Sequence, residues 1–245
     1  MITIILCFYW YLIKEIDKKE LTILREKFTT LAIDEKVWGG GLFIFYHVFA
    51  YLEDAKERLH NADLDKLFVH KCLYRKKAFE EDLAHYLGDD WQAIPKAPAL
   101  ENYLQHLQDL EQDKPMLLMA YIYHLYLGLL SGGQILSKKR QMFGDSKHSY
   151  TSCDKINTNW YFSDIDIPKL KTDFRTAMNE IADHLTDAEK DALIDESSQV
   201  FIMNNLIVNS VGGQNKVLYN MLYKASAVAF LVGTVIFAYK LHKSM

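Results

Sequence analysis

Apolar residues recur at helical spacing along most of this chain. Across residues 40–59 and 73–88 they return every three or four positions before the sequence turns charged, and the second run stops at Gly88. A strand would alternate apolar and polar residues, and the sequence shows no such pattern. The pattern therefore predicts an all-α fold.

Turn and cap residues divide the remaining helical stretches. Pro95 and Pro98 mark a short loop before the next predicted helix. Residues 137–168 are polar and predict one long loop. Thr186 and Glu189 have the spacing of a capping box, which predicts the start of the last helix of the domain.

Glycines interrupt the most apolar of these helices, "AYIYHLYLGLLSGGQIL" at residues 120–136. Each glycine in a helix costs about 1 kcal/mol relative to alanine, so Gly128, Gly132 and Gly133 need a reason. Gly128 and Gly132 are four apart, share one helix face and leave a strip of bare backbone. The strip predicts a kink, a close crossing of two helices, a turn between helices, or a surface for a bound ligand.

The C-terminal part of the chain has a different composition. Residues 225–239 carry no charge and lie between Lys224 and Lys240. As a helix they cover roughly 22 Å of a hydrocarbon core of about 30 Å, and apolar residues upstream with snorkelling lysines make up the difference. We expect a C-terminal transmembrane tail anchor, the alternative being a buried core helix. A tail anchor inserts after synthesis, which predicts a helical domain facing the cytosol at the endoplasmic reticulum membrane.

Composition excludes several other classes of protein. The 245 residues include 28 basic and 32 acidic side chains, so no basic field attracts nucleic acid. The three cysteines have neither zinc-site nor disulfide spacing, which favours a reducing compartment. No HExxH or GxSxG motif indicates a different catalytic centre.

Several motifs together resemble one family, the heme oxygenases of animals. The resemblance rests on the order, spacing and residue types of "FYHVFAYLE" (45–53), "LYRKKAFEEDLAHYLGDDW" (73–91), "YLGLLSGGQIL" (126–136), "FRTAMN" (174–179) and "VFIMNN" (200–205). It covers about residues 14–212, the expected heme-oxygenase-like domain. An apolar segment of unassigned role (1–13) precedes this domain, and a linker (213–224) leads to the expected anchor.

The resemblance implies both a fold and an activity. The implied fold is all-α and holds heme between a proximal helix near the N-terminus and a kinked distal helix. The implied reaction opens heme oxidatively to biliverdin, carbon monoxide and ferrous iron, with heme as substrate and cofactor. Dioxygen and electrons from an NADPH-dependent reductase complete the implied partners.

Individual residues match positions of that family. By resemblance, Gly128, Gly132 and Gly133 are the distal glycines, where bare backbone leaves room for dioxygen and directs it to one edge of the macrocycle. Asn204 matches a polar position in the distal water network, and the alternative is an ordinary buried amide.

Three further positions match residues that face the heme edge and its propionates. They are Tyr123, Lys171 and Arg175, a hydroxyl and two cations suited to two carboxylates. The alternatives are core packing for Tyr123 and a solvated helix face for the two cations.

Two positions depart from the family pattern. Leu129 stands where the family has an aspartate that orders water for proton delivery, which predicts slower or leakier chemistry. Asp17 stands where the family has the axial histidine of the iron, and a hard carboxylate ligand would lower the reduction potential. None of the nine histidines is an obvious replacement; His47, for example, is interpreted as packing.

Three hypotheses follow. The first is a working heme oxygenase with an unusual axial ligand. The second is a heme-binding protein without turnover, which Leu129 and Asp17 together favour. The third is a membrane-anchored helical scaffold that has lost the cofactor and in which the glycine strip packs against a helix.

Overall fold

The computed structural model describes residues 34–68, 70–133 and 166–213, together with residues 215, 217, 219, 223 and 226. Within these ranges every regular element is helical, which confirms the predicted all-α class. The α-helices are α3 (Glu35–Leu59), α4 (Ala62–Leu67), α5 (Lys76–Leu87), α6 (Pro98–Asp113), α7 (Leu118–Gly128), α10 (Ile167–Ala182) and α11 (Asp187–Ser210). The short turns are η1 (Lys71–Leu73), η2 (Trp91–Ala93), η3 (Pro115–Leu117) and η4 (Leu129–Gly133). Asp17, the segment 1–13 and most of the stretches 137–168 and 225–239 lie outside the described residues.

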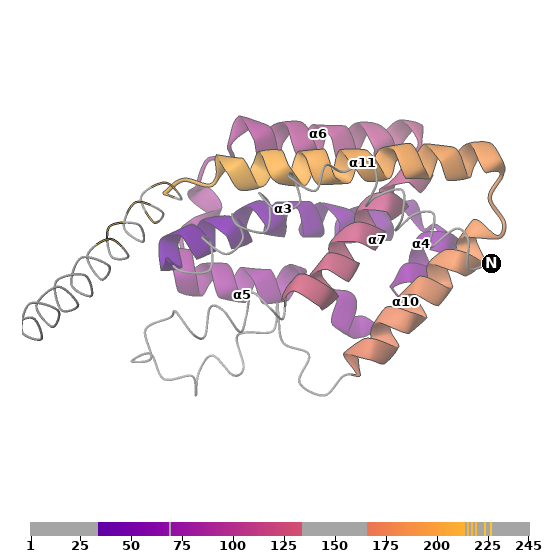
Figure 1. Ribbon diagram of the computed structural model, residues 1–245, viewed down its shortest axis with the longest axis horizontal. Helices are drawn as coiled ribbons and strands as arrows, with labels where there is room; N and C mark the ends of the chain where they lie inside the picture. Colours follow the sequence, from indigo (N-terminus) through magenta and orange to yellow (C-terminus); the bar gives the residue numbers. More distant parts are fainter. Residues whose placement is uncertain are drawn as a thin grey trace, which may run out of the picture.

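The long helices are arranged around α7. Helices α6 and α11 lie side by side along one edge of the molecule, with α3 next to them and α5 against α3 (Figure 1). Helix α10 lies at the end of the molecule where it contacts α4 (Figure 1). Helix α7 contacts α3, α4, α6 and α11, so the helix with the glycines is the centre of the packing.

Local sequence signals explain where the helices begin and end. The Asp34 side chain accepts hydrogen bonds from the backbone N–H groups of Lys36 and Val37, at 3.0 and 3.1 Å, so α3 begins earlier than the apolar pattern indicates. Helix α5 ends at Gly88, which has φ of 86° as the sequence predicts. The predicted capping box between Thr186 and Glu189 is also present at the start of α11.

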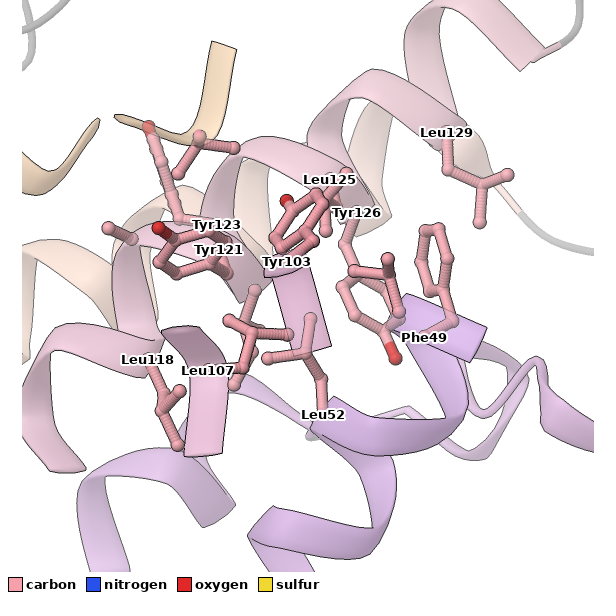
Figure 2. Packing of buried hydrophobic residues seen from close by; sticks show 14 of the residues in the cluster. Phe49, Leu52, Tyr103, Leu107, Leu118, Tyr121, Tyr123, Leu125, Tyr126 and Leu129 are labelled. Atoms are coloured by element: carbon pink, nitrogen blue, oxygen red, sulfur yellow. The ribbon is translucent and has the colours of Figure 1, made fainter. Parts of the chain in front are cut away.

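The core is built on α7, because eight of its eleven residues are buried. Figure 2 shows Tyr121, Tyr123 and Tyr126 of this helix among leucines of α3 and α6. The stretch Pro115–Gly132 is long and apolar enough to cross a membrane, but most of it is buried inside the domain. Its apolarity is that of a central core helix.

The chain turns directly after α11 and packs back onto the start of α3. Gly213 has φ of 86°, and a Cβ at this position would lie 3.0 Å from the Val37 Cγ2 atom. The Val217 N–H donates to the Gly213 carbonyl at 3.2 Å, and the Val217 side chain is 7% exposed. Residues 215, 217, 219, 223 and 226 are helical, so the predicted linker 213–224 contains helical residues, of which Val217 packs on the domain.

Candidate functional site

The glycine strip forms a distinct backbone feature at the end of α7. The α-helix ends at Gly128 and continues as the π-helical turn η4, Leu129–Gly133. A π turn inside a helical segment changes the direction of the helix and is often found at functional sites. This change of direction is consistent with the kink that is one of the predictions from the three glycines.

The space beside these glycines is open. A Cβ built on Gly128 or Gly132 would have no neighbouring heavy atom within 4 Å. Two other helical glycines differ: a Cβ on Gly39 would lie 2.6 Å from Leu87 Cδ2, and one on Gly40 would lie 3.0 Å from Val211 Cγ1. Gly39 and Gly40 therefore permit close helix packing. Gly128 and Gly132 instead leave bare backbone that no side chain of the described part of the chain covers.

Leucines, not charged side chains, fill the positions beside the glycines. Leu129 and Leu130 of the π turn are 4% and 1% exposed, and Leu125 one turn earlier is 6% exposed. Leu129 is thus part of the core, and no carboxylate stands at this position. This turn can supply bare backbone and apolar surface, whereas proton transfer would need another group.

Tyr123 and Arg175, two of the candidates from sequence, are brought together by the packing of α10 on α7. The Tyr123 ring stacks on Phe174, with centroids 5.9 Å apart and planes at 11°. Burial raises the pKa of Tyr123, and a hydrogen bond with the neighbouring Arg175 guanidinium opposes this shift. The stacked ring and the hydrogen bond together hold the guanidinium against α7.

Lys171 lies one helical turn before Arg175 on α10, and both side chains are partly buried. Residues four apart share a helix face, so the two cations are close neighbours. Two cations, one of them held by a tyrosine hydroxyl, can bind a ligand that carries two carboxylates.

Asn204 of α11 lies apart from the cations, against α6. Its Oδ1 atom accepts a hydrogen bond from the hydroxyl of Tyr103 at 3.1 Å, and Tyr103 is 1% exposed. The side-chain oxygen is therefore satisfied, as the alternative interpretation from sequence requires. The bond also fixes the orientation of an amide that could hold water.

Sequence reasoning missed a second polar cluster between α6, α7 and α11. Glu196 Oε1 accepts from the Tyr121 hydroxyl at 2.5 Å and contacts His106 Nε2 at 2.7 Å. Each of these residues lies on a different helix, so no sequence spacing reports the cluster.

Sequence reasoning also missed a carboxylate, Glu53, that is buried in the core. Glu53 is 5% exposed and accepts hydrogen bonds from the Arg75 N–H at 2.6 Å, the Lys76 N–H at 3.2 Å and the Tyr126 hydroxyl at 3.1 Å. Burial raises the pKa of Glu53, and these hydrogen bonds oppose the shift. Its signal in the sequence is a glutamate four residues after Phe49, on the apolar stripe of its helix.

Several histidines of the described ranges are engaged in packing or in contacts with acids. His47 packs edge-on against Phe43, with centroids 4.7 Å apart, as its interpretation from sequence predicts. His124 contacts Phe201, with centroids 5.1 Å apart, and His70 Nε2 lies 3.1 Å from Asp173 Oδ2. No group of three or more metal-ligating side chains occurs among the residues that the structure describes.

The open glycine turn and the paired cations fit a planar ligand that carries carboxylates. Gly128 and Gly132 provide exposed backbone, and Lys171 with Arg175 provides two cationic groups for carboxylates. Heme is planar and carries two carboxylates, so the described residues fit this group.

Comparisons with known proteins agree with this geometry. The model of the heme oxygenase family matches residues 18–210. Heme oxygenase of Rhodella violacea is 33% identical over 175 residues, covering 70% of this chain and 71% of that protein. Human heme oxygenase 1 is 33% identical over 161 residues, covering 65% of this chain and 54% of that protein, so the match spans about half of the human sequence.

Solved structures show the same fold. Heme oxygenase-1 of Synechocystis, solved in complex with heme, has a TM-score of 0.69 at 25% identity and covers 85% of this chain and 94% of that chain. Heme oxygenase 2 of Chlamydomonas reinhardtii, solved without heme, has a TM-score of 0.67 at 28% identity and covers 78% of this chain and 90% of that chain.

Proposed function

This chain belongs to the heme oxygenase family, and from that premise we propose that it binds heme against the glycine turn of α7 and opens it oxidatively. The products would be biliverdin, carbon monoxide and ferrous iron. Dioxygen would be the oxidant, and an NADPH-dependent reductase would supply the electrons.

One observation carries the proposal: apart from the helix's own backbone and chain neighbours, no heavy atom of the described residues lies within 4 Å of a Cβ built on Gly128 or Gly132. A glycine that only allowed two helices to cross would have a neighbour at that distance, as Gly39 and Gly40 do. Keeping glycines that destabilise a helix beside open space is explained by a ligand that occupies the space.

Each candidate residue has a separate task in this function. Heme, when bound, supplies the iron at which dioxygen is activated and the macrocycle that is opened. Lys171 and Arg175 would hold its carboxylates, and Tyr123 would keep the Arg175 guanidinium in place. Gly128, Gly132 and Gly133 would keep side chains away from one face of the macrocycle and so select the edge that reacts.

Proton delivery is one of the two steps for which this chain departs from the pattern of its family. The buried Leu129 side chain cannot hold or transfer a proton. Water held by Asn204 and by the backbone of the π turn would take this task, with the Asn204 amide oriented by Tyr103. Turnover slower than in relatives with the aspartate is the expected consequence.

The expected cellular setting is a membrane surface. The uncharged stretch 225–239 would anchor the chain in the endoplasmic reticulum membrane, with the helical domain on the cytosolic side. The reductase would then meet the domain from the same side of the membrane.

A heme-binding protein without turnover is the second candidate, because Leu129 and Asp17 both remove groups that the family uses. Such a protein would keep Lys171, Arg175 and the open glycine turn, yet fail to deliver protons or to hold the iron with an imidazole.

Heme titration of the full chain in mild detergent separates these candidates. Absorption spectra of the ferric, ferrous and ferrous–CO forms report ligation of the iron, and addition of reductase and NADPH reports turnover. Asp17→His and the control Asp17→Asn are measured in parallel.

Each outcome selects one candidate. Biliverdin from the wild-type chain supports the oxygenase. Heme binding with biliverdin only from Asp17→His supports the second candidate. Failure of every variant to bind heme leaves a helical scaffold and contradicts both.

A further inference from the structure

Two tyrosines that follow the domain are far more exposed than its other large apolar side chains. Tyr219 and Tyr223 are 72% and 76% exposed, whereas Leu206, the next most exposed large apolar residue of the described ranges, is at 53%. Both tyrosines are helical and four residues apart, so they share one helix face. Most of the surface of both side chains is therefore left uncovered by the described part of the domain.

The same helix is fixed to the domain on another side. Val217 is 7% exposed and belongs to the hydrophobic core, and its N–H donates to the Gly213 carbonyl. A Cβ on Gly213 would lie 3.0 Å from Val37 Cγ2, so the preceding turn is packed against the start of α3. The exposed pair is therefore held at a defined place beside the domain.

The uncharged sequence begins within one helical turn of this pair. Ser226 is helical and its hydroxyl donates to the Tyr223 carbonyl at 2.8 Å, so helical conformation is found at Tyr223 and again at Ser226, one residue after the uncharged stretch starts. At about 1.5 Å per residue, Tyr223 lies roughly 3 Å and Tyr219 roughly 9 Å along the axis from Ala225.

Counted from Ala225, these distances place Tyr223 within the headgroup layer of a bilayer and Tyr219 at its outer boundary. The headgroup region adds about 5–8 Å on each side of the hydrocarbon core, and tyrosines are enriched there because their rings are apolar and their hydroxyls are polar. Lys224 follows Tyr223 directly and can extend its ammonium group toward the headgroups.

We propose that Tyr219 and Tyr223 form an interfacial contact with the headgroup region of a lipid bilayer and hold the domain close to the membrane surface. Val217, which is packed in the core, lies only eight residues before Ala225, or about 12 Å along a helix. The end of the domain where α3 begins and α11 ends therefore faces the lipid. This inference rests on the proposed membrane anchor and is independent of the heme chemistry.

Fluorescence quenching in vesicles tests the contact. The full chain is reconstituted in phosphatidylcholine and phosphatidylserine vesicles, with lipids brominated at a shallow position of the acyl chain. Tyr219→Trp and Tyr223→Trp each add one indole, whose emission is obtained as the difference from the parent chain. Emission from position 223 is expected to lose most of its intensity, and emission from position 219 a smaller part.

Tyr74→Trp is the matched control. Tyr74 is 36% exposed and its hydroxyl donates to Glu57 at 3.3 Å, which places it near the far end of α3. Glu57 and Val37 are separated by about 30 Å along that helix. The indole at position 74 is expected to stay unquenched.

Each other outcome overturns the inference in a different way. A chain that does not sediment with vesicles has no membrane contact, which also removes the proposed anchor. A chain that sediments but shows no quenching at 219 and 223 has the pair in water. Emission that shifts to the blue with rising protein-to-lipid ratio, without quenching, shows that a second copy covers the pair. None of these results changes the heme titration, so the two proposals fail separately.

Discussion

The Tyr126 hydroxyl donates a hydrogen bond to Glu53 Oε1 at 3.1 Å, and Tyr126 lies two residues before Gly128, with which α7 ends. The same carboxylate accepts the backbone N–H groups of Arg75 and Lys76 at the start of α5. One buried side chain of α3 therefore satisfies polar groups of both α5 and α7. The position of the glycine turn depends on this contact as well as on apolar packing.

Replacing Glu53 by alanine is expected to destabilise the domain by about 2–4 kcal/mol, because a helix cap is lost and the buried Tyr126 hydroxyl is left without its acceptor. Denaturant unfolding in detergent, followed by circular dichroism, measures the change. Glu57→Ala is the control, since the Glu57 side chain is 61% exposed. Equal stability of the two variants would contradict the structural role of Glu53.

The variant Gly128→Ala is expected to keep the stability of the domain and to bind heme more weakly. The added methyl group meets no side chain of the described residues, so the free energy of unfolding should stay unchanged or rise by up to about 1 kcal/mol. Heme affinity should fall, because the methyl group enters the space proposed for the ligand. The control Gly39→Ala should lower stability, because its Cβ would lie 2.6 Å from Leu87 Cδ2. Unchanged heme affinity in Gly128→Ala would remove the main support for the proposed site.

Replacing Arg175 by leucine is expected to weaken heme binding by about 1.5–3 kcal/mol, or roughly tenfold to a hundredfold in Kd, because a charge-assisted hydrogen bond is lost. Lys169→Gln is the matched control, since Lys169 is exposed on the same helix. Absorption titrations of both variants give the two dissociation constants. Similar dissociation constants for the two variants would mean that Arg175 serves only to pair with Tyr123.

The stability of the domain is expected to fall as the pH drops from 6.5 toward 4, in part because of His47. Burial, with a smaller effect of Lys96, lowers the pKa of His47 to about 4 from its usual 6.5. In this window the unfolded chain binds a proton that the folded chain does not, so acid favours unfolding.

Replacing His47 by phenylalanine tests this dependence. The loss of stability between pH 7 and pH 4.5 should shrink by about 1–2 kcal/mol, allowing for the partial exposure of the side chain. The variant His85→Gln, at an exposed position of α5, should keep the dependence of the wild-type chain. Thermal unfolding at each pH measures both, and identical curves for His47→Phe and wild type would exclude His47 as the source.

The sequence by itself determined the helical class, several helix boundaries and the family. Apolar spacing, Gly88 and the capping box of Thr186 predicted elements that the structure confirms, because these signals act within a few residues of the chain. The order of five motifs identified the family, which the match over residues 18–210 confirms.

Tertiary structure alone decided which of these residues meet. Spacing left open whether Gly128 contacts another helix, and only the packed fold shows that no other helix of the described ranges covers it. The contacts of Glu53 with Tyr126, and of Glu196 with Tyr121, join residues more than 70 positions apart. Such contacts depend on how helices pack in three dimensions, and periodicity along one chain carries no information about a partner on another helix.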